Sequence, residues 1–140
     1  MKTRPVLEHD AVLSALHAIK DELVRRGKTA VIAIVDAHGE LLALLRLDGA
    51  PLPSVQVAMN KAYSAARLRR PTRVLGETLR ARGIDIAFYG DPRFTGFGGA
   101  LPVTLAGAVV GGVGVSGLSD DEDEALAAIG VALLEGTRQG

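Results

Sequence analysis

The sequence has no cysteine and no tryptophan, and aromatic residues are scarce throughout. The lack of cysteine excludes disulfides, thiolate metal sites, iron–sulfur clusters and a cysteine nucleophile. Three Phe and two Tyr among 140 residues are too few for the stacking surfaces that bind single-stranded nucleic acid. The 16 basic residues balance the 16 acidic ones, so no net field draws the chain to nucleic acid or to an anionic membrane.

Long apolar runs are also missing. No run approaches the ~20 apolar residues that cross a bilayer, and the N-terminal segment MKTRPVLEHD lacks the apolar centre of a signal peptide. We therefore expect a cytoplasmic protein whose partner is a small molecule and neither a membrane nor a nucleic acid.

What the chain does have is aliphatic content, with 48% hydrophobic residues in a length typical of one domain. No linker, repeat or low-complexity segment interrupts it, so residues 1–140 are expected to form a single domain.

The spacing of apolar residues predicts four helices and four clear strands. The helices are expected at Leu7–Arg26, at Pro53–Arg69, at Thr72–Arg82, and from Ser119 to about Thr137. The strands are expected at Thr29–Asp36, Glu40–Leu47, Leu101–Leu105 and Val109–Ser116. Short turns join the strands in pairs, so each pair must be antiparallel. The fold class is therefore α/β (α+β), an antiparallel sheet with helices packed on it.

Four segments in register resemble the GlcG/HbpS-like family, which includes the C-terminal domain of PduO-type proteins. The segments are Val31–Pro51, Val57–Glu77, Gly98–Val103 and Val109–Leu133. Within them, the features shared with the family are Arg46 and Asp48 after the first hairpin, Lys61-Ala62, Pro71-Thr72, and Gly112–Gly117 followed by Asp123.

The resemblance implies a profilin-like fold with a five-stranded antiparallel sheet. The fifth strand would have to come from Thr95–Gly98. Relatives assemble into dimers and larger homo-oligomers and some bind haem, so the resemblance implies a homo-oligomer with noncovalent haem as a candidate cofactor. The stretch Asp91–Phe97 departs from the family pattern, and ligand specificity is expected to differ there.

Two histidines on the first predicted helix are candidate haem ligands. His9 and His17 are eight residues apart and project to broadly similar faces. A neutral imidazole ligates haem iron well, and the resemblance points to a first-helix histidine, for which we take His17. The alternative is that both are surface residues. His38 falls in a hairpin turn and is expected to be exposed.

Lys61 is the most informative single residue, because the helical wheel places it at the border of a buried stripe. Its amine would pair with Asp48, with Asp123 or with a ligand carboxylate, or would act as a base if desolvated. The alternative is a buried salt bridge that locks the helix to the sheet. For Asp123 the alternative is an acidic residue that complements the dipole of its own helix.

Glycines within a strand indicate close approach of another backbone or a ligand. We therefore expect a glycine-lined cleft beside the helix that carries Lys61. The residues expected to bind a ligand there are Arg46, Lys61, Thr72, Arg93, Phe94, Gly98, Gly99 and Asp123.

Three functions fit these observations. The first is a small oligomeric ligand-binding protein, with haem as a candidate ligand, and the resemblance favours it. The second is a catabolic enzyme, an isomerase, lyase or hydrolase of an organic acid, with Lys61 as base or charge clamp and Arg46, Arg93 and Thr72 assisting. The third is an accessory subunit without a ligand of its own.

Overall fold

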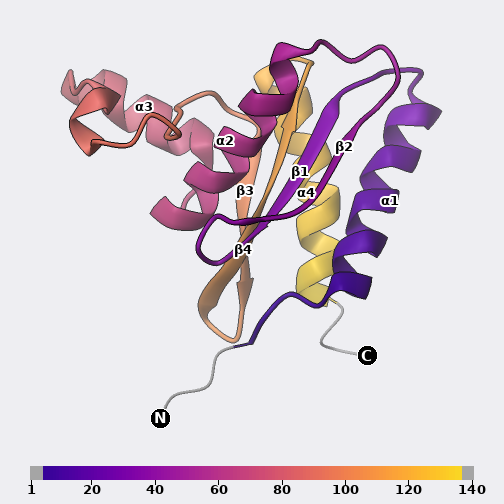
Figure 1. The fold of residues 1–140 in the computed structure, drawn as a ribbon. Helices are drawn as coiled ribbons and strands as arrows, with labels where there is room; N and C mark the ends of the chain where they lie inside the picture. Colours follow the sequence, from indigo (N-terminus) through magenta and orange to yellow (C-terminus); the bar gives the residue numbers. More distant parts are fainter. Residues whose placement is uncertain (1–4, 137–140) are drawn as a thin grey trace.

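A computed structural model describes residues 5–136 and confirms the predicted order of elements (Figure 1). The elements are α1 (His9–Arg25), β1 (Val31–Asp36), β2 (Leu41–Arg46), α2 (Pro53–Leu68), α3 (Thr72–Arg82), the 3-10 helix η1 (Ile86–Tyr89), β3 (Ala100–Leu105), β4 (Ala108–Ser116) and α4 (Asp120–Gly136). The predicted end of the last helix, near Thr137, lies outside the described residues. No helix within residues 5–136 is both long and apolar enough to cross a bilayer.

The described strands form one antiparallel sheet in the order β2-β1-β4-β3. Helices α1 and α4 cover one face, α2 covers the other, and α3 extends to the side (Figure 1). In β1, Ile32 and Ile34 pack on the α1–α4 side, whereas Val31, Ala33 and Val35 pack against α2. A strand buried on both faces reads as a nearly continuous apolar run, and this explains the sequence TAVIAIVD.

The glycines of β4 allow α2 to lie directly on the sheet. A Cβ atom built on Gly112 would lie 2.5 Å from the carbonyl oxygen of Ala62, and one on Gly114 would lie 2.6 Å from that of Ala58. Helix α2 presents small residues at this contact, among them Ala58, Ala62 and Ala66. The expected close approach of a backbone to the glycine-containing strand is confirmed.

The fifth strand expected at Thr95–Gly98 is not present, and the described residues form a four-stranded sheet. Side-chain oxygens, not a neighbouring strand, accept the hydrogen bonds of this segment. The amide of Thr95 donates to Ser64 Oγ at 2.9 Å, that of Phe97 to Thr95 Oγ1 at 3.2 Å, and that of Gly98 to Asp120 Oδ2 at 3.1 Å. Because side-chain oxygens accept these amide hydrogen bonds, the segment forms a loop and not a strand.

Among residues 5–136, two non-glycine residues adopt left-handed backbone conformations. Arg69 ends α2 with φ 57°, and Ala106 lies in the β3–β4 turn with φ 50°. This conformation disfavours any residue with a Cβ by about 1–2 kcal/mol. Glycine is the usual residue just after a helix, so arginine at position 69 is a departure from ordinary helix termination.

Candidate functional site

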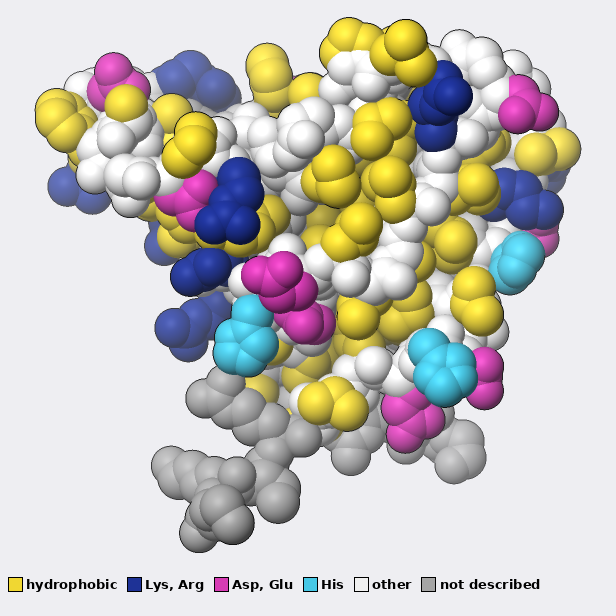
Figure 2. Space-filling view, in the orientation of Figure 1, with side chains coloured by type: hydrophobic (Ala, Val, Ile, Leu, Met, Phe, Trp, Pro, Cys, Tyr) yellow, Lys and Arg dark blue, Asp and Glu magenta, His cyan; other side chains and the backbone are white. Residues whose placement is uncertain are grey.

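A largely apolar groove lies between α1 and the edge strand β2. Its volume is about 540 Å³. It is lined by Leu7, Glu8, His9, Asp10, Val12, Leu13, Leu42 and Ala43. Leu13 and Leu42 remain 47% and 44% exposed. Figure 2 shows hydrophobic side chains spread over β2 and the adjoining face of α1. Large exposed apolar side chains gathered in one place mark a ligand or partner surface.

A β-bulge shapes the floor of this groove. Ile34 pairs with Ala43 and Val35 pairs with Leu41, so Leu42 is an extra residue in β2. Bulges re-aim side chains at sheet edges. Here the bulge lets the consecutive residues Leu42 and Ala43 both line the groove, where a regular strand would turn one of them away.

The two histidines of α1 lie at different places relative to this groove, and the assignment of His17 as haem ligand stays a prediction. His9 is among the lining residues, although its side chain is 92% exposed and its Nε2 lies 3.6 Å from Asp10 Oδ1. His17 is also exposed, two turns further along α1, and is not among the lining residues. His38 is exposed in the β1–β2 turn, as expected. Residues 5–136 contain no group of three His, Cys, Asp or Glu side chains able to hold a metal ion. The histidine that lines the groove is His9.

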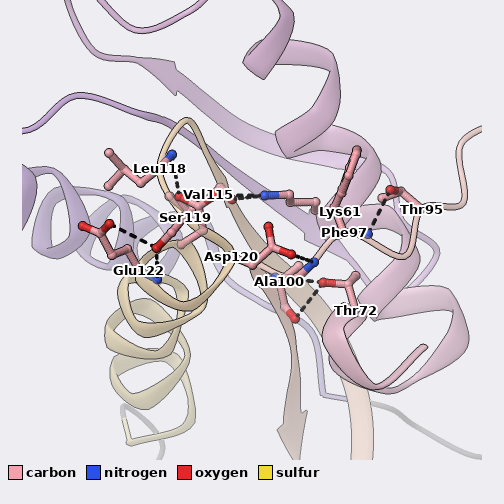
Figure 3. A network of polar contacts seen from close by, with 12 residues as sticks. Lys61, Thr72, Thr95, Phe97, Ala100, Val115, Leu118, Ser119, Asp120 and Glu122 are labelled. Carbon is pink, nitrogen blue, oxygen red and sulfur yellow. Dashed lines mark hydrogen bonds and ion pairs between the residues drawn. The ribbon is translucent and has the colours of Figure 1, made fainter. Parts of the chain in front are cut away.

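Lys61 lies on the buried side of α2, facing β4 and α4 (Figure 3). Its Nζ donates to Asp123 Oδ2 at 3.0 Å and to the carbonyl oxygen of Val115 at 3.0 Å. Lys61 is 2% exposed and Asp123 is 1% exposed. A Cβ atom on Gly99 would lie 2.7 Å from the amine, so only glycine fits there. The structure thus brings Lys61, Gly99 and Asp123 together.

The geometry of this pair matches a buried salt bridge. Burial raises the pKa of the Asp123 carboxyl, and the Lys61 ammonium opposes that rise. Asp123 also accepts a hydrogen bond from the amide of Leu118 at 3.2 Å. Protein groups therefore compensate both charges. The ion pair and its hydrogen bonds connect α2 to β4 and to the first turn of α4.

Thr72 takes part in further polar contacts beside Lys61 (Figure 3). Thr72 is fully buried. Its Oγ1 accepts from the amide of Ala100 at 3.1 Å and donates to the carbonyl oxygen of Ala100 at 3.5 Å. Gly98 donates to Asp120. These contacts fix the start of β3 against α3 and α4.

Three of the expected ligand residues lie outside this network. Arg93 pairs with Asp91 at 3.1 Å and places its guanidinium 4.2 Å from the centre of the Tyr63 ring. Phe94 packs on the same ring at 5.3 Å between centroids. Arg46 is exposed at the end of β2 and lines a separate hollow beside α1. The expected ligand residues therefore divide among three places.

The Tyr63–Asp91–Arg93 cluster anchors the loop before β3, and we expect this anchor to fail in acid. Hydrogen bonds from Arg93 and Tyr63 hold the pKa of Asp91 well below its ordinary value of 3.8. A carboxyl with a lowered folded-state pKa stabilises the fold above its ordinary pKa, and that stabilisation disappears as the pH falls towards the folded-state value. In urea unfolding, the stability gap between wild type and Asp91→Asn should shrink between about pH 5 and pH 2. A gap independent of pH would contradict this assignment.

Comparison with known proteins identifies the family. The model of the family described as haem degrading protein, HbpS-like, matches residues 7–132. This chain belongs to the HbpS-like family. It is 32% identical to the protein GlcG of Escherichia coli K12 over 83% of this chain and 85% of that protein. It is 30% identical to the corrinoid adenosyltransferase PduO of Salmonella typhimurium LT2, over 89% of this chain but 39% of that protein.

Solved structures agree with this assignment. A double mutant of Streptomyces reticuli HbpS superposes with a TM-score of 0.87 at 32% identity, covering 96% of this chain and 90% of HbpS. The structure of a PduOC:heme complex superposes with a TM-score of 0.85 at 25% identity, covering 92% of this chain and 95% of PduOC. The sequence resemblance to the GlcG/HbpS-like family is confirmed.

Proposed function

We propose that this HbpS-like chain is a small-ligand-binding protein and that haem, held noncovalently in the α1–β2 groove, is the ligand its geometry supports best. The observation that carries the proposal is an apolar groove of about 540 Å³ with an imidazole among its lining residues. The heme complex of the similar PduOC structure supports the same ligand class.

Each part of the groove suits one part of a porphyrin. Leu7, Leu13 and Leu42 supply apolar surface for the macrocycle. The imidazole of His9 would hold the iron. Glu8 and Asp10 would repel carboxylate substituents, so the propionates would point away from the start of α1. When bound, haem supplies an iron centre for ligand binding and electron transfer.

Haemin titration tests this proposal. Wild-type protein should give a saturable change in the Soret band, and His9→Ala should weaken binding about tenfold or more. His17→Ala is the matched control on the same helix and should bind haemin within about twofold of wild type. If His17→Ala weakens binding while His9→Ala does not, the iron ligand is His17 and the groove assignment is wrong. The absence of a saturable Soret change in the wild type would refute haem as the ligand.

The edge strand supports a proposal that the chain forms homo-oligomers. In β2, Leu41 and Leu44 pair with Val35 and Ala33, so they face the α2 side, yet they stay 47% and 36% exposed. An apolar edge strand is normally covered or interrupted by charge. We propose that a second copy of this chain covers it.

Light scattering after size exclusion tests that assembly. Wild type should elute as a dimer or larger species, and Leu44→Lys should shift it towards the monomer because a charge on the edge opposes pairing. Val24→Lys adds the same charge to another exposed aliphatic side chain, on α1, and should leave the assembly unchanged. A monomeric wild type would count against the proposal.

The enzyme alternative has less support. A base must reach its substrate, but the Lys61 amine is buried, ion-paired and covered by Gly99. Substrate would have to displace Gly99 or α4 to contact it. The ligand-binding proposal needs no such movement.

A further inference from the structure

A second cavity, of about 440 Å³, lies where three chain segments converge beyond the end of α2. The segments are the β1–β2 turn, the C-terminal end of α2 and the β3–β4 turn. The cavity is lined by Ala37, His38, Ala66, Arg67, Arg69, Gly107, Ala108 and Val109. Neither the haem proposal nor the Lys61 network uses any of these residues.

The ionisable groups lining this cavity are all basic. Arg67 and Arg69 supply guanidinium groups and His38 supplies an imidazole. Figure 2 shows a histidine on this side of the molecule with Lys and Arg side chains on one side of it and Asp or Glu side chains on the other. Within residues 5–136, the arginines that pair with carboxylates are others, namely Arg25, Arg26, Arg73 and Arg93. Arg67 contacts the Tyr63 ring at 5.1 Å, which leaves its donors available.

The acidic residues Asp36 and Glu40, which flank the β1–β2 turn, make contacts of their own. Asp36 accepts hydrogen bonds from the amides of His38 at 2.8 Å and of Glu40 at 3.0 Å, so it closes its own turn. The charge of Glu40 acts on Arg93, whose pKa it helps to raise. Within residues 5–136, neither Arg67 nor Arg69 is among the arginines that form an ion pair with a carboxylate.

The backbone near this cavity adopts an unusual conformation at two residues, and one of them is an arginine. Arg69 holds the left-handed conformation in which glycine is normally found, and Ala106 in the facing turn does the same. Such departures cluster at binding sites, where surrounding structure maintains them. Arg69, exposed at the end of α2, is one of the residues that line the cavity.

We propose that this cavity binds a small molecule through an oxyanion group, either a phosphate or a carboxylate. The planar guanidinium fork matches both anions in bidentate geometry, and His38 adds a further donor. The cavity is large enough for a metabolite that carries the anion and not only for a free ion. This site is separate from the α1–β2 groove, so the anion-binding proposal does not depend on whether the protein binds haem.

Isothermal titration with inorganic phosphate and with citrate tests the proposal. Wild type should bind at least one of the two saturably at one site per chain, and the tighter probe identifies the anion class. Arg67→Gln and Arg69→Gly should each weaken that binding about tenfold or more. Arg70→Gln removes an equal charge from the neighbouring residue, whose Nε donates to the carbonyl of Leu68, and should stay within about twofold.

Arg69→Gly also separates binding from folding. Glycine adopts the left-handed conformation without the steric strain that a Cβ causes. This variant should therefore be at least as stable as wild type while it binds the anion more weakly. Failure of both probes to bind the wild type would overturn the site. Equal weakening by Arg70→Gln would overturn it as well, because it would show a diffuse charge effect. Haemin titration of Arg69→Gly should match wild type.

Discussion

Lys61→Ala is expected to lower the free energy of unfolding by about 3–5 kcal/mol, because it leaves the Asp123 carboxylate buried without its partner. Urea denaturation followed by circular dichroism measures the loss. Lys20→Ala is the matched control. Lys20 pairs with Asp21 at 2.7 Å on the surface, and exposed pairs contribute little to stability.

A double variant distinguishes the lost pair from lost packing. Replacing a buried ion pair by apolar groups of similar volume is often neutral or stabilising, so Lys61→Met with Asp123→Leu should recover most of the stability lost in Lys61→Ala. If Lys61→Ala unfolded at the same urea concentration as wild type, the amine would have to be solvated and the buried pair would be refuted. Loss of an activity in Lys61→Ala would also not identify a base unless the variant were shown to be folded.

Gly114→Ala is expected to destabilise the protein by about 1–3 kcal/mol or more, the range typical of overpacking. The added Cβ would lie 2.6 Å from the carbonyl oxygen of Ala58 and 2.8 Å from the amide nitrogen of Ala62. Both are backbone atoms of α2, so the helix would have to move as a unit away from β4.

Gly136→Ala is the control for Gly114→Ala. No atom lies within 4 Å of a Cβ built on Gly136, and alanine favours the helix in which it lies. Its midpoint in thermal or urea unfolding should match or exceed that of wild type. A Gly114→Ala variant as stable as Gly136→Ala would mean that α2 does not contact the sheet at Gly114.

The features predicted correctly from sequence depend on local pattern. Unbroken apolarity at 31–35 indicates a strand buried on both faces, and glycines at 112 and 114 indicate a backbone pressed against it. Both follow from rules about neighbouring residues. The pairing of Lys61 with Asp123 is one of the predicted alternatives, because a buried ammonium requires a carboxylate and Asp123 is among the residues shared with the family.

The features that escaped prediction depend on the arrangement of distant segments. The bulge at Leu42 arises from register against β1, and LLALLR contains no glycine or proline that would indicate it. The segment Thr95–Gly98 becomes a loop because Ser64 and Asp120 accept its hydrogen bonds, and these residues are remote in sequence. Likewise, His9 and His17 look equivalent on a helical wheel, and only the position of β2 separates them.

The order in which the chain is made has a consequence for Lys61. Its partners Val115 and Asp123 lie 54 and 62 residues downstream. A nascent chain that has reached β1, β2 and α2 thus holds an ammonium that it cannot yet neutralise in an apolar interior. Stable docking of α2 through this ammonium therefore requires that β4 and the first turn of α4 have already been synthesised.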